Sequence, residues 1–179
     1  CVQMSNLPSA TNSNTTFTIS PSNNLSYSTT YKIRVSTGAK DASSNALSNQ
    51  FETSNGFTTG IEPDTTAPTV SSIYPNNSAT SVYNAATITV KFAEAMDINT
   101  STTNTSNTTC SGRLQVSTNN FNNCVQMSVS PVATGDNTTF TNFPAGNLAS
   151  SSTYKIRVST GAKDTSGNAL TSQYETSNG

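Results

Sequence analysis

An internal repeat constrains this chain more than any other feature of its sequence. Residues 1–56 align without a gap to residues 124–179, at a constant offset of 123 residues, and about 39 of the 56 positions are identical. Both copies open with CVQMS and share the block TYKIRVSTGAKD. A repeat of about 123 residues has the usual size of one globular domain. The sequence therefore predicts a tandem array of similar domains.

The phase of the repeat places both ends of the chain inside a domain. The best candidate for a linker is residues 60–68, which contain two prolines, a glycine and short polar residues. We expect the second half of a preceding repeat in residues 1–60, a linker in 61–68 and a nearly complete repeat in 69–179. The second half occurs twice and the first half once, so an exchange of halves between identical chains would leave one half unmatched. We interpret the chain as a window on a longer array; the alternative is a short subunit that another molecule completes.

Short runs of alternating apolar residues come at regular spacing through the complete repeat. Two of these runs have a clear period of two, and their inward-facing residues are expected to be Ile88, Val90, Phe92, Tyr154, Ile156 and Val158. Seven strands are predicted in all, at residues 69–74, 87–92, 113–117, 125–129, 138–141, 154–159 and 173–176. No stretch shows helical periodicity. The pattern predicts an all-β protein folded as an antiparallel sandwich.

Composition and charge exclude several classes of function. Charged residues make up 9% of the chain, the net charge is −1 and there is no histidine. Nucleic-acid binding requires clustered Lys and Arg, whereas the eight basic residues here are scattered. No apolar run approaches the roughly 20 residues that cross a bilayer. We therefore expect no nucleic-acid partner and no membrane insertion within this segment, and a targeting segment would lie outside the chain.

Three segments of the complete repeat carry a family resemblance. They are APTVSSIYPNNSATSV from Ala67, TITVKFAEAMD from Thr87 and NLASSSTYKIRVSTGAKDTSGNAL from Asn147. With these segments, residues 66–179, and residues 1–56 by repetition, resemble the bacterial Ig-like repeats of surface-layer proteins, adhesins and large secreted repeat proteins. The resemblance implies an Ig-like Greek-key sandwich of about seven strands and an extracellular or cell-surface location. It implies no particular ligand, because one fold hosts many functions.

The three cysteines lie at positions 1, 110 and 124. Cys110 and Cys124 bracket a strand, an Asn-rich turn and a second strand. A disulfide across this 15-residue loop would stabilise by about 3 kcal/mol and would suit an extracellular compartment. The alternative is a pair of buried free thiols. Cys1 is the repeat counterpart of Cys124, so we expect its partner upstream of the chain; a lipidated N-terminal Cys1 is the competing hypothesis, and no histidine is present to activate a catalytic thiol.

The acidic residues in the loops permit two interpretations. Calcium sites between tandem domains use loop carboxylates, which makes Asp64, Glu94 and Asp97 candidate ligands. No acidic cluster with a recognisable ligand spacing is present, so calcium is the weaker hypothesis and no other cofactor is expected. For Asp164 and its counterpart Asp41 we expect a structural role, in which the carboxylate bonds the backbone of its own loop. No aromatic cleft accompanies these acids, so we do not expect an enzyme.

Tyr154 lies six residues after Leu148 and resembles the tyrosine corner of Greek-key sandwiches. In that motif the tyrosine hydroxyl bonds to nearby backbone. Tyr31 and Leu25 repeat the spacing in the first copy. The motif predicts a structural role for these four residues.

Two functions remain after these exclusions. The first is a structural module, in which repeats in series form a stalk, spacer or filament and contact neighbouring repeats or copies of the same protein. The second is an adhesin module that binds a host, matrix or carbohydrate ligand through loops at one end of the sandwich. Between the two copies the loops differ by small polar exchanges, such as Ser43-Ser44 against Ser166-Gly167. These exchanges favour the structural module.

Overall fold

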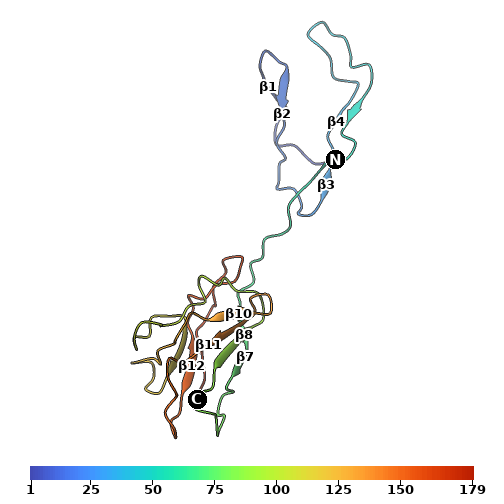
Figure 1. The fold of residues 1–179 in the computed structure, drawn as a ribbon. Coiled ribbons are helices and arrows are strands. Elements are labelled where there is room, and N and C mark those ends of the chain that lie inside the picture. Colours follow the sequence, from blue (N-terminus) through green and yellow to red (C-terminus); the bar gives the residue numbers. More distant parts are fainter. The chain divides into compact units, whose positions relative to one another are not determined.

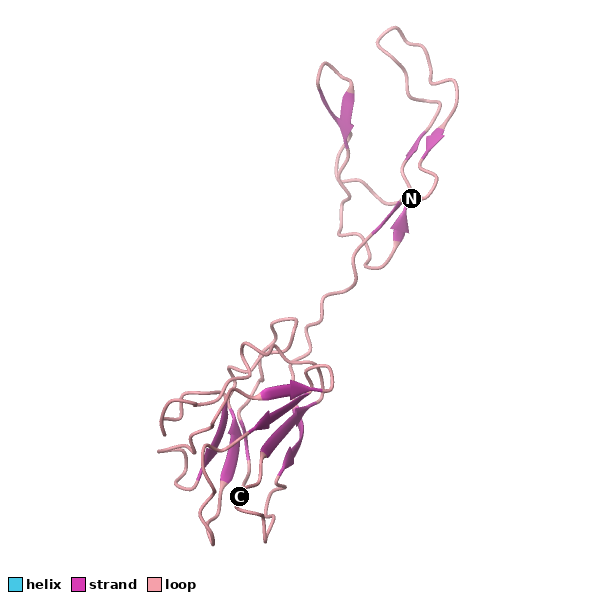
Figure 2. Cartoon of the chain, viewed as in Figure 1, coloured by secondary structure: helices cyan, strands magenta, loops and turns pink.

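The computed structural model describes all residues, 1–179, and divides the chain into two compact units. Unit 1 is Cys1–Pro63 and unit 2 is Asp64–Gly179. Strands are the only regular elements (Figures 1 and 2). The structure contains no helix that could cross a membrane. All strand pairs are antiparallel.

Unit 2 consists of two sheets. One sheet has the strand order β10-β11-β8-β7 and the other the order β13-β12-β9. The strands are β7 Val70–Tyr74, β8 Ile88–Phe92, β9 Leu114–Ser117, β10 Val132–Thr134, β11 Thr139–Asn142, β12 Lys155–Val158 and β13 Tyr174–Glu175. The chain crosses between the sheets after β8, after β9 and after β11, which is the kind of connection that builds an Ig-like sandwich.

One hydrophobic core joins the two sheets of unit 2. The period-two alternation of β8 buries Ile88, Val90 and Phe92. Phe92 meets Phe140 of β11 edge to face, with the ring centroids 5.8 Å apart. The second sheet adds to the same cluster the side chains of Leu114, Val116, Ile156 and Val158. The expected all-β antiparallel sandwich is confirmed.

Six of the seven predicted strands are present, each with ends within one residue of the expected position. The predicted strand at residues 125–129 is wrong. The backbone N–H groups of this segment donate to three different places: that of Val125 to Val116, that of Met127 to Asn104 and that of Ser128 to Phe143. Because successive backbone hydrogen bonds go to different segments, residues 125–129 do not pair with one neighbouring strand and form no β-ladder.

Strand β10 was not predicted from the sequence. It pairs with β11 through Val132↔Thr141, Ala133↔Phe140 and Thr134↔Thr139. Its alternation is too short to detect, because only three residues separate Pro131 from the turn at Gly135. That turn runs through positive φ at Gly135, Asp136 and Asn137, a conformation that Gly, Asp and Asn adopt most readily.

Unit 1 contains six short strands in three separate two-stranded ladders. The pairs are β1–β2, β3–β6 and β4–β5, with bounds β1 Ser9–Thr11, β2 Thr16–Thr18, β3 Thr30–Tyr31, β4 Arg34–Val35, β5 Phe51–Glu52 and β6 Phe57–Thr58. None of its large apolar side chains is buried. Unit 1 therefore has local strand pairing without a hydrophobic core.

Candidate functional site

Three carboxylates converge in unit 2. Asp64 precedes β7, Glu94 follows β8 and Asp164 follows β12. One carboxylate oxygen atom of each residue lies within 4.8 Å of those of the other two. The sequence made Asp64, Glu94 and Asp97 candidate calcium ligands. Asp97 is not in this group; its carboxylate instead accepts bonds from the backbone and side chain of Asn99, at 2.9 and 3.0 Å. The oxygen atoms of the cluster are of the kind that hard cations prefer.

Asp164 is held by its own loop. Its Oδ1 accepts the backbone N–H groups of Ser166 and Asn168, both at 2.8 Å, and its Oδ2 accepts the side-chain amide of Asn168 at 2.8 Å. The amide of Asn168 also donates to the backbone carbonyl of Asp64 at 3.1 Å. Asp164 is 1% exposed, although Thr165, Ser166 and Gly167 of its loop are exposed. Asp164 therefore closes the loop, and Asn168 ties the loop to the start of unit 2.

The cluster shifts two pKa values in opposite directions. Desolvation raises the pKa of Glu94, and the neighbouring charges of Asp164 and Asp64 raise it further. For Asp164, burial acts to raise the pKa, but hydrogen bonds from Asn168, Ser166 and Gly167 outweigh it and hold the pKa below its usual value. Of these two carboxylates, Glu94 is therefore the one whose ionised form is disfavoured in the folded protein.

The first repeat contains the same loop without the cluster. Oδ1 of Asp41 accepts the backbone N–H groups of Ser43 and Asn45, at 2.9 and 2.8 Å, and Oδ2 accepts the amide of Asn45 at 3.0 Å. Asp41 is exposed. Because the bonds form in both copies, they belong to the loop itself and do not depend on neighbouring acids.

The loop between Cys110 and Cys124 is closed by a disulfide, with the Cα atoms 5.0 Å apart. Cys124 is buried, while Cys1 is free and exposed. Next to the disulfide lies Asn104, a buried residue of the polar segment 99–109. Its side-chain amide donates to the carbonyl groups of Asn107 and Val125, at 2.8 and 3.1 Å. The sequence carries no signal for this anchoring role, because Asn104 stands in an uninterrupted run of Asn, Ser and Thr.

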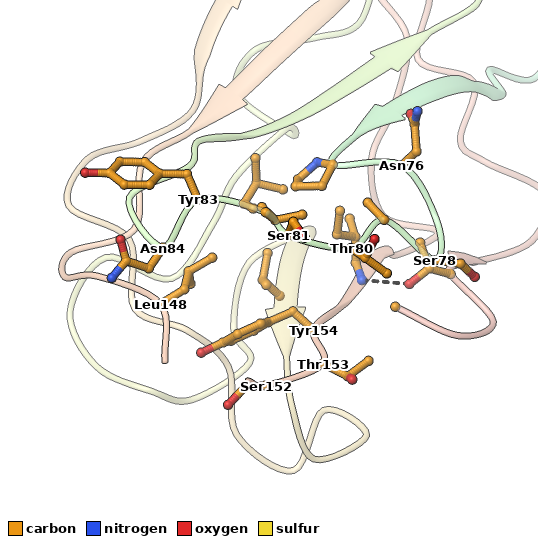
Figure 3. Close-up of a pocket in the computed structure, with 18 of the residues that line it drawn as sticks. Asn76, Ser78, Thr80, Ser81, Tyr83, Asn84, Leu148, Ser152, Thr153 and Tyr154 are labelled. Atoms are coloured by element: carbon orange, nitrogen blue, oxygen red, sulfur yellow. Dashed lines mark hydrogen bonds between the residues drawn. The ribbon is translucent and has the colours of Figure 1, made fainter. Parts of the chain in front are cut away.

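A hollow with a volume of about 740 Å³ lies at one end of the sandwich of unit 2. Its walls come from segment 75–84 and segment 148–154 (Figure 3). Tyr83 and Tyr154 lie on these walls and Ile88 and Ile156 at the base, and no charged side chain lines the hollow. The hollow offers apolar surface with hydroxyl and amide groups, which suit contacts to a neutral ligand or chain. Its lining contains no acidic or basic side chain.

Both parts of the chain match one protein-family model, described as a bacterial Ig-like domain, over residues 2–59 and 64–177. The chain belongs to this bacterial Ig-like family. The match covers both copies of the repeat, in agreement with the resemblance found in the sequence. A search of curated proteins found no match.

Solved structures similar to this bacterial Ig-like chain are those of the S-layer protein SbsC. The crystal structure of rSbsC(31-844) is 22% identical with a TM-score of 0.43, and the N-terminal part of SbsC is 21% identical with a TM-score of 0.44. Each alignment covers 62% of this chain, and it covers 13% and 23% of the respective SbsC chains. The chain thus spans less than a quarter of either SbsC structure.

The tyrosines of the Ig-like repeat bond to backbone in both copies. Tyr154 Oη accepts the N–H of Ala149 at 2.8 Å, and Tyr31 Oη accepts the N–H of Ser26 at 3.0 Å. Leu148 is buried and Leu25 is half-buried. These contacts are of the kind that stabilise the corner of a sandwich.

Proposed function

We propose that this bacterial Ig-like chain is a structural part of an extracellular repeat array, which forms a stalk, spacer or filament on or outside a bacterial cell. The observation that carries the proposal is the repeat itself. Two copies that differ at about 17 of 56 positions form the same hairpin and the same Asp-closed loop. An array that acts as a spacer tolerates near-identical copies, because each copy adds the same length to the array.

The chemistry of the surface supports a structural role. Charged residues are few, and the hollow at the end of the sandwich has no charged side chain. The buried acid, Asp164, is occupied by three hydrogen bonds to its own loop. The proposal therefore includes no catalysis, and it names neighbouring repeats or copies of the same protein as partners, with no nucleic acid and no membrane insertion.

The proposed location rests on family membership and on the Cys110–Cys124 disulfide. Disulfides persist in oxidising compartments and are rare in the reducing cytosol of mesophiles. A bacterial Ig-like chain with a disulfide is therefore expected at or outside the cell surface. Thiol alkylation of cell-surface protein, followed by intact mass, measures whether Cys110 and Cys124 are bridged in the native material.

An adhesin module is the second candidate, and the hollow is the observation that favours it. The hollow has room for part of a sugar or peptide, and Tyr83 at its rim is 74% exposed. Exposed tyrosines are frequent anchors of binding sites. In this candidate function, the loops 75–84 and 148–154 would hold a neutral ligand.

Electron microscopy of the native material, with the intact mass measured under denaturing conditions, distinguishes the two functions. A structural array gives long fibres or stalks with an axial repeat of one or two sandwiches and a polypeptide much larger than 18.7 kDa. Discrete particles with the mass of this chain alone would overturn the structural proposal. The adhesin candidate would then be tested on a glycan array, with Tyr83→Ser as the variant expected to lose binding.

A further inference from the structure

Asn-x-Ser/Thr sequences, the acceptor pattern of N-linked glycosylation, occur seven times in the chain. Their asparagines are Asn14, Asn24, Asn76, Asn99, Asn104, Asn107 and Asn137. In a chain this rich in Asn, Ser and Thr such sequences also arise by chance, so the pattern alone identifies no site. An acceptor asparagine must in addition expose its Nδ2 atom, which forms the bond to the sugar, and must leave that atom without a protein partner. The structure separates the seven sequences on these two criteria.

Two of the asparagines use their Nδ2 atoms inside the protein. Asn104 is 2% exposed, and its Nδ2 donates to the carbonyl groups of Asn107 and Val125. Asn99 is exposed, but its Nδ2 donates to the carboxylate of Asp97 at 3.0 Å. Neither nitrogen atom is available for a sugar.

Three further sequences are part of a strand or of the tyrosine corner. Those that begin at Asn14 and Asn137 end inside strands, at Thr16 of β2 and Thr139 of β11. In the third, which begins at Asn24, the next residue is half-buried and the residue after that donates its backbone N–H to the tyrosine of the corner. A transferase that has to enclose all three residues cannot do so while one of them is paired or packed.

The sequence at Asn76 is also engaged. The side chain of Asn77, its middle residue, accepts the backbone N–H of Asn178 at 3.2 Å, and its last residue, Ser78, donates its backbone N–H to the carbonyl of Gly179. These bonds hold the sequence against another segment of unit 2.

The sequence Asn107-Thr108-Thr109 differs from the other six. It lies in five consecutive exposed residues, 105–109. Oδ1 of Asn107 accepts the backbone N–H of Thr109 at 2.8 Å, which forms a turn closed by the asparagine side chain. Because this bond engages Oδ1, the Nδ2 atom has no protein partner and is the end of the side chain that is free to react. The same bond places Thr109, the hydroxyl residue of the acceptor pattern, beside the amide.

The segment around Asn107 is held in place through its backbone. Nδ2 of Asn104 donates to the carbonyl of Asn107 at 2.8 Å, and the N–H of Cys124 donates to the carbonyl of Thr108 at 2.7 Å. The Cys110–Cys124 disulfide closes the base of the segment. None of these contacts uses the Nδ2 atom of Asn107. A glycan can therefore be attached there without breaking a contact that holds the segment.

We propose that Asn107 carries an N-linked glycan, with Thr109 as the hydroxyl residue that the transferase requires. The donor is a glycosyl diphosphate, linked either to a lipid or to a nucleotide. Nδ2 of Asn107 forms a bond to the anomeric carbon of the sugar, while the bond from that carbon to the diphosphate oxygen breaks. The diphosphate leaves with the electron pair, and one amide proton passes to a base of the transferase.

The test is peptide mapping of the native protein, isolated from the bacterium that produces it. Peptides that contain residues 99–109 are sequenced by electron-transfer fragmentation, which keeps a glycan on its residue. We expect a glycan on Asn107 and none on Asn104. A single sugar identifies the nucleotide-linked donor, because such donors transfer one sugar at a time, and an oligosaccharide identifies the lipid-linked donor.

Matched variants produced in the same bacterium separate the acceptor sequence from its surroundings. Asn107→Gln and Thr109→Ala should each abolish the glycan, whereas Thr109→Ser should retain it. The control is Ser106→Ala, which removes the hydroxyl of the sequence at Asn104 and should leave the glycan unchanged. Thr109→Ala keeps the backbone N–H that bonds to Asn107, so a loss of the glycan in this variant reports the hydroxyl and not the turn. An intact Cys110–Cys124 disulfide shows that each variant has folded.

Three results would overturn the inference. The first is native protein in which Asn107 is unmodified. The second is a glycan that persists in Thr109→Ala, and the third is a glycan on Asn104, which would contradict the selection by burial. None of these results depends on whether the native material forms fibres, so the inference and the proposed function can fail separately.

Discussion

At the scale of single residues, Asp164 and Asp41 form a matched pair. Both close the same loop with the same three hydrogen bonds, but Asp164 is buried and Asp41 is exposed. We expect Asp164→Ala to lower the free energy of unfolding of unit 2 by about 1–3 kcal/mol, because it removes a buried carboxylate together with the three hydrogen bonds that close its loop. Asp41→Ala should have a much smaller effect, since water reaches its loop. Hydrogen exchange in denaturant measures the effect of Asp164→Ala at the amides of β8 and the effect of Asp41→Ala at the amides of β4. Equal effects of the two substitutions would contradict a role for burial.

Glu94 gives unit 2 a pH dependence of defined sign. Its pKa is raised in the folded state by desolvation and by the charges of Asp164 and Asp64, so the folded state binds more protons than the unfolded state above about pH 4.5. The stability contributed by Glu94 is therefore present at low pH and falls as the pH rises through the raised pKa. Glu94→Gln should remove this loss and raise the melting temperature at pH 7.

The measurement is a series of melting curves between pH 4 and 8, with Glu62→Gln as a control outside unit 2. Asp164 acts in the opposite direction: its pKa is lowered, so its contribution is present above about pH 3.8 and is lost as the pH falls further. If the melting temperature of Glu94→Gln depends on pH above 4.5 as that of the unchanged chain does, the pKa of Glu94 is not raised in the folded state.

At the scale of the elements, β8 and β11 carry the core of unit 2. Phe140→Ala removes a fully buried ring that contacts Phe92, and we expect a loss of about 3–5 kcal/mol in the free energy of unfolding. The repeat supplies the control: Phe17→Ala removes an exposed ring at the equivalent position and should change the stability of the chain by less than about 0.5 kcal/mol. Denaturant unfolding followed by tyrosine fluorescence tests the pair. A large effect of Phe17→Ala would mean that unit 1 has a core of its own.

Elements with strong local patterns could be predicted from the sequence, and those held by distant partners could not. Strand β8 alternates over its whole length, so its inward residues follow from period two alone. Strand β10 and the segment 125–129 both consist of apolar and small polar residues. Pairing with β11 makes β10 a strand, whereas hydrogen bonds to several different segments keep residues 125–129 irregular.

The candidate site shows the same limit. The loop role of Asp164 follows from its position beside Asn168, because both lie in one short turn. The convergence of Asp64, Glu94 and Asp164 depends instead on how three separate elements are placed in the sandwich. Sequence spacing therefore suggested Asp97, which is near Glu94 in the chain, and gave no indication of the contact with Asp164.

At the scale of the whole chain, the two units represent one repeat at two stages of completion. Unit 2 contains both halves of a sandwich and a continuous core. In unit 1 the ladders β1–β2 and β4–β5 correspond to β10–β11 and β12–β13, and no large apolar side chain is buried. Burial of apolar surface is the main favourable term in folding, so a unit without a core gains little beyond local pairing.

The difference in burial predicts a large difference in resistance to proteolysis. Local opening costs little free energy where few apolar contacts are buried, so the exposed Phe17, Phe51 and Phe57 should be cut by chymotrypsin early. Cleavage next to the buried Phe92 and Phe140 of unit 2 requires opening of its core, which we expect to slow cutting at these sites by about a thousandfold or more. Limited digestion followed by intact mass should therefore give a persistent fragment that begins near Asp64. Early cutting within β8 or β12 would contradict the assignment of the core to unit 2.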